Sequence, residues 1–161
     1  MAACIRGRAP SSSLSYHESG SHLFVASEDD CVLRVVDCLN GGAPHMIKLQ
    51  REGIRTVKAT HHSRCVLFSP GSNSGPKKNN VYYLSVHDNK ILREFEGHQG
   101  VITSMSISPV DDTFLSSSAD GTVRYVDLIT DQDDDVSKQS LILVRSLHNS
   151  MLQAMGCRKV R

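Results

Sequence analysis

A pattern that occurs twice in the chain constrains the fold more than any other feature. Residues 24–37 read FVASEDDCVLRVVD, and residues 114–127 read FLSSSADGTVRYVD. The two segments align without a gap at an offset of 90 residues, and six of their fourteen positions are identical. The identical pairs are Phe24/Phe114, Ser27/Ser117, Asp30/Asp120, Arg34/Arg124, Val36/Val126 and Asp37/Asp127. This offset leaves room for one more unit of about 45 residues between the two copies.

The second copy of the pattern lies in the clearest unit of the chain. Alternating apolar residues predict three strands in this unit, namely Val101–Ser108, Thr113–Ser118 and Thr122–Leu128. Within the first of these strands, Val101, Met105 and Ile107 are expected on one side. Proline and aspartate in residues 109–112 and the Asp-Gly pair at 120–121 favour turns between the strands.

Two further units are expected before this one. The expected strands of the middle unit are Gly53–Thr60, Cys65–Ser69, Val81–Val86 and Lys90–Phe95. The expected strands of the first unit are Leu14–Tyr16, Leu23–Ser27, Cys31–Asp37 and Met46–Leu49. Leu141–Val144 is the candidate fourth strand of the last unit. The high strand content, with no helical periodicity before residue 136, predicts an all-β chain.

Units of this length built from four strands are typical of the blades of a β-propeller. The chain is therefore expected to form a partial propeller of about three four-stranded antiparallel blades, covering residues 13–50, 53–95 and 97–147. Residues 1–12 are expected to be an untethered N-terminus and residues 148–161 a C-terminal tail. Because closed propellers have about four to eight blades, three blades predict a fragment, a truncated product or a partial gene model.

Charge, hydropathy and cysteine content exclude several classes of protein. The formal net charge of +1 argues against strong direct binding to nucleic acid. No apolar run approaches the ~20 residues that a membrane span requires, so no membrane partner is expected. The five cysteines form no Cys-x-x-Cys pair, which is typical of reduced thiols in a nuclear or cytosolic protein.

No group of residues predicts a cofactor or a bound metal. The aspartates of residues 131–135 have the spacing that opens a calcium loop, but Val136 and Ile142 replace the glycine and glutamate of such a loop. The His61-His62 pair has Cys65 three residues on, but no second ligand pair is spaced to complete a zinc site. A polar loop beside a buried cysteine is the preferred interpretation.

Two segments carry a resemblance to a known family. Residues 83–98 read YLSVHDNKILREFEGH and residues 106–114 read SISPVDDTF. Together they resemble the WD-repeat subunit of COMPASS-type histone lysine methyltransferase complexes, which also occurs in complexes for RNA 3′-end processing and transcription termination. The resemblance covers roughly residues 13–128. It implies a seven-bladed parent propeller, of which this chain would hold the N-terminal part.

The resemblance also implies a structural hydrogen-bond network in each well-formed blade. Here the network maps onto His98, Asp120 and a strand serine, Ser116 or Ser118. The family places a tryptophan at the position of Val126, and this chain contains no tryptophan. An alternative reading makes His98 a general base oriented by Asp120, but a Gly-His pair in a repeat is better explained by folding.

Three functional hypotheses remain. The first is a non-catalytic nuclear scaffold that binds protein partners, such as methyltransferase or transcription-complex subunits, through exposed loops. Its candidate partner-contacting residues are His87, Asp88, Asn89 and Arg93. The second is an adaptor that reads a charged or phosphorylated peptide through Arg34 and Arg124. The third is a truncated product without independent function, because open sheet edges favour aggregation.

Overall fold

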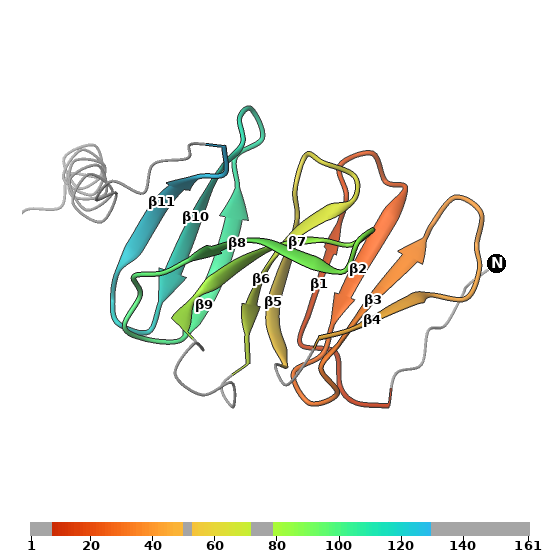
Figure 1. Cartoon of the computed structure of the whole chain (residues 1–161), viewed down its shortest axis with the longest axis horizontal. Helices are drawn as coiled ribbons and strands as arrows, with labels where there is room; N and C mark the ends of the chain where they lie inside the picture. Colours follow the sequence, from red (N-terminus) through yellow and green to blue (C-terminus); the bar gives the residue numbers. More distant parts are fainter. Residues whose placement is uncertain (1–7, 50–52, 72–78, 130–161) are drawn as a thin grey trace, which may run out of the picture.

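The computed structural model describes residues 8–49, 53–71 and 79–129. These residues form eleven strands in three antiparallel sheets that stand side by side in chain order (Figure 1). No helix in the described part of the chain is long and apolar enough to cross a membrane. The expected strand Leu141–Val144, the expected tail 148–161 and the aspartates of 131–135 all lie outside the described residues.

Each sheet corresponds to one predicted unit. The first sheet contains β1 (Ser13–Tyr16), β2 (His22–Ala26), β3 (Val32–Asp37) and β4 (His45–Lys48), paired in that order. The second contains β5 (Ile54–Ala59), β6 (Cys65–Pro70), β7 (Val81–Ser85) and β8 (Lys90–Phe95), also in order. The third contains β9 (Ile102–Ile107), β10 (Thr113–Ser118) and β11 (Val123–Asp127). The prediction of an all-β, partial propeller is confirmed.

The first strands of the sheets, β1, β5 and β9, are neighbours in space. Serine side chains join β1 to β5, because Ser13 and Ser15 accept hydrogen bonds from backbone N–H groups of β5 at 3.3 and 3.1 Å. Ser12 donates to the carbonyl of Ile54 at 2.6 Å, and its own N–H donates to Ala26. Ser12, one residue before the expected boundary at residue 13, therefore already takes part in these contacts.

Two apolar clusters fill the spaces between the sheets. The first cluster joins the first and second sheets and includes Phe24, Leu33 and Phe68. The second joins the second and third sheets and includes Leu67 and Phe114. Alternate residues of β6 thus belong to different clusters, because successive side chains of a strand point to opposite faces. All six residues of β6 are buried, as expected for the central strand of a sheet packed on both faces.

The expected alternation in the first strand of the third sheet is interrupted by a bulge. Ile102 and Met105 are buried, although an odd spacing separates them, and Val101 lies outside the strand. The pairing of β9 with β10 shifts between Ser117 and Ser118, which is the signature of a β-bulge. β5 has the same irregularity near its start, where Ile54 is buried. The bulge re-aims the first residue of each strand into the core.

The gapless alignment of the two repeat copies is wrong by one residue in β2 and β10. Phe24 lies opposite Val35, whereas Phe114 lies opposite Val126. The β2–β3 connection therefore contains one residue more than the β10–β11 connection. Because a one-residue shift moves side chains to the other face, Phe24 faces the following sheet and Phe114 faces the preceding one. The two phenylalanines are not structurally equivalent.

Candidate functional site

His98 lies in the connection between β8 and β9, and its side chain joins that connection to two strands of the third sheet. Its Nε2 atom lies 2.9 Å from the hydroxyl oxygen of Ser116 on β10. Its Nδ1 atom lies 3.0 Å from Thr122 Oγ1 and 3.3 Å from Asp120 Oδ2, in and after the β10–β11 turn. These four residues form what we call the His98 network.

Hydrogen-bond chemistry assigns the proton of His98 to Nδ1. The Thr122 hydroxyl donates to Asp120 Oδ1 at 2.6 Å, so the Thr122 oxygen is left to accept from Nδ1–H. Nε2 then accepts the hydroxyl proton of Ser116. Burial lowers the pKa of His98, and this effect outweighs the raising effect of Asp120. A neutral imidazole thus satisfies every contact in the network.

Asp120 is the acceptor that holds the β10–β11 turn to the preceding connection. Its Oδ2 accepts the backbone N–H of Gln99 at 2.7 Å, and its Oδ1 accepts the backbone N–H of Thr122 at 2.8 Å. Burial raises the pKa of Asp120, but hydrogen bonds from Thr122 and Gln99 together lower it by more than burial raises it. The net pKa therefore lies well below the ordinary range. The carboxylate is therefore ionised at neutral pH.

Ser116, His98 and Asp120 have the order of contacts found in a catalytic triad, but the arrangement cannot accept a substrate. Ser116 is 2% exposed and His98 is 8% exposed, so no carbonyl group can approach the serine oxygen. A nucleophilic serine must be within reach of the substrate. Within the described residues, no group of three or more His, Cys, Asp or Glu side chains could hold a metal. The arrangement can order loops, and it cannot perform hydrolysis.

The second candidate serine has a different place. Ser118 accepts the backbone N–H of Asp120 at 3.3 Å and has no hydrogen bond to His98 among the described contacts. Val126, which stands where the family has tryptophan, packs against the second apolar cluster. The structure therefore brings Ser116 to the ring of His98, whereas Ser118, the last residue of β10, is bonded to the turn that follows.

Replacing Asp120 with alanine is expected to lower the free energy of unfolding by about 1–3 kcal/mol, because the donors of Thr122 and Gln99 lose a charged acceptor. Chemical denaturation at neutral pH measures the effect. Asp29→Ala is the matched control, since Asp29 is exposed and lies in the corresponding turn of the first sheet. Equal effects of the two substitutions would contradict a stabilising role for the His98 network.

The same pair of variants has a defined pH dependence. The carboxylate of Asp120 has a lowered pKa in the folded chain, so its contribution is complete above the ordinary value of about 3.9. The contribution declines as the pH falls from that value through the folded pKa. The difference in stability between the wild type and Asp120→Ala is therefore expected to shrink in acid.

The arginines proposed to read a peptide are both engaged in structural contacts. Arg34 is 5% exposed and forms an ion pair with Asp30, four residues earlier. Arg124 donates to the carbonyl of Gly97 at 2.6 Å. Burial raises the pKa of Asp30, but the hydrogen bond from Arg34 contributes to a net lowering. Arg34 is buried and Arg124 is half-buried, and each guanidinium is already bonded to a group of the fold, so the geometry gives no support to the peptide-reader hypothesis.

Asp30 and Asp120 occupy corresponding turns but bind different partners. Asp120 contacts His98, whereas Asp30 contacts Arg34 of its own sheet. Each aspartate also accepts a backbone N–H two residues on, from Val32 or Thr122, which fixes the turn. A buried arginine thus supplies in the first sheet the cationic or polar partner that His98 supplies in the third.

Three of the four predicted partner-contacting residues form one exposed turn between β7 and β8. His87 and Asp88 are 63% and 64% exposed in their side chains and lie 2.9 Å apart. Hydrogen bonds from His87 and Ser85 lower the pKa of Asp88, which keeps the carboxylate ionised. Asn89 has a positive φ of 50°, the conformation that the turn requires.

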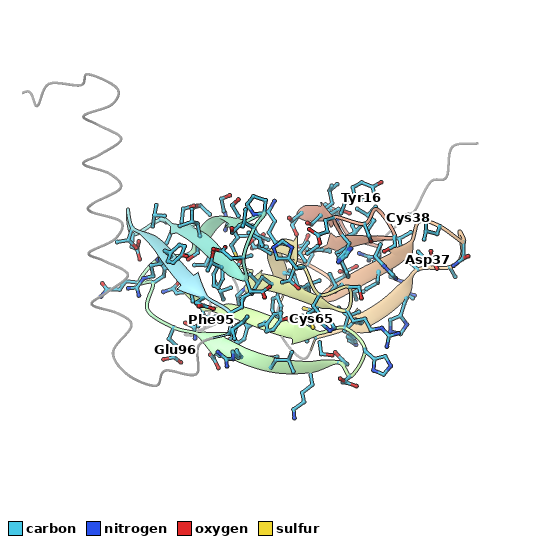
Figure 2. All side chains as sticks on the ribbon, turned by 90° about the horizontal axis from the view of Figure 1, so that it is seen from above. Tyr16, Asp37, Cys38, Cys65, Phe95 and Glu96 are labelled. Carbon is cyan, nitrogen blue, oxygen red and sulfur yellow. The ribbon has the colours of Figure 1, made fainter. Side chains whose placement is uncertain are left out.

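The fourth residue, Arg93, does not belong to this turn. It lies on β8, and its guanidinium donates to the carbonyl of Ile129 at 3.4 Å, after the end of β11. Arg93 therefore links the second sheet to the third. Figure 2 labels Phe95, at the end of the same strand, and Cys65, at the start of β6, and both side chains lie among other side chains of the sheets.

Comparisons with known proteins identify the repeat and its relatives. The family described as "WD domain, G-beta repeat" matches residues 89–127. WD repeat-containing protein 82 of Drosophila melanogaster is 37% identical over 115 residues, which are 71% of this chain and 35% of the relative. Set1 complex component swd2 of Schizosaccharomyces pombe is 38% identical over 116 residues, which are 72% of this chain and 31% of the relative.

A third relative has a similar extent. COMPASS component SWD2 of Saccharomyces cerevisiae is 31% identical over 119 residues, which are 74% of this chain and 35% of the relative. The chain spans about a third of the length of the curated relatives it matches. These matches confirm the WD-repeat prediction and the resemblance drawn from residues 83–98 and 106–114.

Proposed function

We propose that this WD-repeat chain acts as a non-catalytic scaffold in a histone lysine methyltransferase complex of the Set1 or COMPASS type, in the nucleus. The observation that carries the proposal is the similarity to two proteins named as components of the Set1 complex and of COMPASS. The burial of Ser116 and His98 supports a non-catalytic role, because the triad-like group that they form with Asp120 is closed to substrates.

We propose the β7–β8 turn as the partner-contacting element of this scaffold. His87 presents an imidazole and Asp88 an ionised carboxylate on the surface, and the hydrogen bond between them fixes both side chains. Ser85 donates to Asp88 at 3.0 Å and orients the carboxylate further. Because a rigid sheet holds this turn, a partner would meet a preorganised polar surface and lose little conformational entropy on binding.

Affinity purification of the tagged chain from cells of its source organism tests both statements. We expect mass spectrometry to detect a methyltransferase subunit with the wild-type chain. We also expect the double substitution of His87 and Asp88 by alanine to reduce its recovery about tenfold or more, as loss of ~1.4 kcal/mol of binding free energy would. The matched control replaces Leu39 and Asn40 by alanine, since both are exposed in the corresponding β3–β4 turn.

The possible outcomes separate the role from the surface. A folded wild-type chain that recovers no methyltransferase subunit would contradict the scaffold proposal. Recovery that is unchanged by the His87 and Asp88 substitutions would retain the scaffold and remove this turn as its contact. Circular dichroism of each variant shows whether a loss of recovery reflects a loss of folding.

A further inference from the structure

His61 connects the loops of three different sheets. It lies in the loop between β5 and β6, and its Nδ1 atom lies 3.0 Å from Oε2 of Glu18 in the β1–β2 loop. Its Nε2 atom lies 2.8 Å from the backbone carbonyl oxygen of Ser108, which follows β9. One imidazole therefore spans from the first sheet to the third, and we call this arrangement the His61 contact.

Both neighbours of the ring are obligatory acceptors. The carbonyl oxygen of Ser108 and the ionised carboxylate of Glu18 carry no hydrogen, so each must receive a proton from the ring. A neutral imidazole has one N–H and can satisfy only one of them. His61 can make both hydrogen bonds only as an imidazolium. His98 differs in this respect, because its neutral form satisfies all of its partners.

The surroundings of His61 favour a positive charge. Three carboxylates interact electrostatically with the ring, namely Glu18 of the β1–β2 loop and Asp111 and Asp112 of the β9–β10 loop. The other charged or titratable groups of its own loop are His62 and Arg64. The backbone N–H of Arg64 donates to Nδ1 of His62 at 3.3 Å. The Ser108 carbonyl, followed by Glu18, raises the pKa of His61 above its ordinary value.

We propose that protonation of His61 is a pH-dependent switch that ties the loops of the three sheets together. The contact is complete below the ordinary titration range of a histidine, about pH 6.5, and is lost as the pH rises through the raised pKa. Above that pH the ring keeps one of its two hydrogen bonds. The first and third sheets are then linked through the second sheet by their apolar clusters, without this connection between loops.

Nuclear magnetic resonance titration of the histidine rings in the full chain tests the protonation directly. We expect the His61 ring to titrate above pH 6.5, and Glu18→Gln to move its midpoint downward. High salt is expected to move it downward as well, because Glu18 is 62% exposed in its side chain and is screened. A wild-type His61 that titrates at or below 6.5 overturns the proposal.

A second measurement tests whether the charge ties the sheets together. Urea unfolding is compared at pH 6 and pH 8.5 for the wild type, His61→Gln and the neighbouring control His62→Gln. His61→Gln is expected to raise the equilibrium constant for unfolding, relative to the wild type, more at pH 6 than at pH 8.5. The additional increase at pH 6 is about tenfold for each unit by which the pKa of His61 in the folded chain exceeds the ordinary one. His62→Gln is expected to lack this pH dependence. If His61→Gln and His62→Gln show the same pH dependence of unfolding, the proposal is refuted. If His61→Gln does not fold, Glu18→Gln takes its place in this comparison.

Discussion

Replacing Phe114 with alanine is expected to lower the free energy of unfolding by about 3–5 kcal/mol, the usual cost of removing a buried aromatic ring. Phe114 is 1% exposed and lies in the cluster between the second and third sheets. Its ring meets Phe95 of the second sheet edge-on, with the ring centres 5.2 Å apart. The cavity left by alanine would be lined by both sheets, so neither sheet could close it alone. Urea unfolding at neutral pH measures the loss.

Leu115→Ala is the matched control for Phe114→Ala. Leu115 is the next residue on β10, but it faces away from the second sheet and is 39% exposed. We expect the control to cost about 1 kcal/mol or less, because a large part of the Leu115 side chain stays in water and its truncation leaves no closed cavity between two sheets. If Leu115→Ala cost as much as Phe114→Ala, the second sheet would not pack against the face of β10 that carries Phe114.

The strands could be predicted from the sequence because local patterns determine them. Alternating apolar residues and turn-forming aspartates placed the strands of the three sheets close to their observed bounds, as β10 (Thr113–Ser118) shows. The turn at Asp120 and Gly121 was predicted for the same reason, and Gly121 has the expected positive φ of 77°. These features depend on a few neighbouring residues.

The face of the sheet on which each phenylalanine lies could not be predicted, because it depends on the length of one connection between strands. Sequence identity pairs Phe24 with Phe114, yet a single extra residue between β2 and β3 places them on opposite faces. The extra residue lies before Asp30. Arg34 and Arg124 therefore remain equivalent, since they follow it. A gapless match shows that a repeat exists without showing which side chains correspond.

The residues of the His98 network came partly from family resemblance. Thr122 of the network and Gln99, which donates to Asp120, were missed, although a threonine two residues after a turn aspartate is a local signal that could have identified Thr122. The His61 contact has no such signal. His61 was considered as a metal ligand with His62, and its actual neighbours Glu18 and Ser108 lie 43 and 47 residues away in the chain. Contacts between loops of different sheets require the fold.

Replacing Gly53 with alanine is expected to destabilise the joint between the first two sheets by about 3 kcal/mol or more, at or above the upper end for overpacking. Gly53 immediately precedes β5, and a Cβ atom at this position would overlap the backbone carbonyl group of Glu28, lying 2.7 Å from its carbon. Ile54 donates its N–H to the neighbouring carbonyl of Ser27 at 3.0 Å, so the two backbones are held together here. A rotamer change cannot relieve a clash with a backbone atom.

Gly42→Ala provides the matched control, because a Cβ atom at Gly42 has no atom within 4 Å and its φ is not positive. The substitution at Gly42 is expected to be neutral or slightly stabilising, since alanine restricts the unfolded chain. The measurement is urea unfolding of both variants, followed by near-ultraviolet circular dichroism of Gly53→Ala. Because the overlap lies between sheets, we expect the strands within each sheet to persist while packing around Phe68 loosens. A Gly53→Ala chain as stable as Gly42→Ala would mean that β5 approaches the β2–β3 turn less closely than the structure shows.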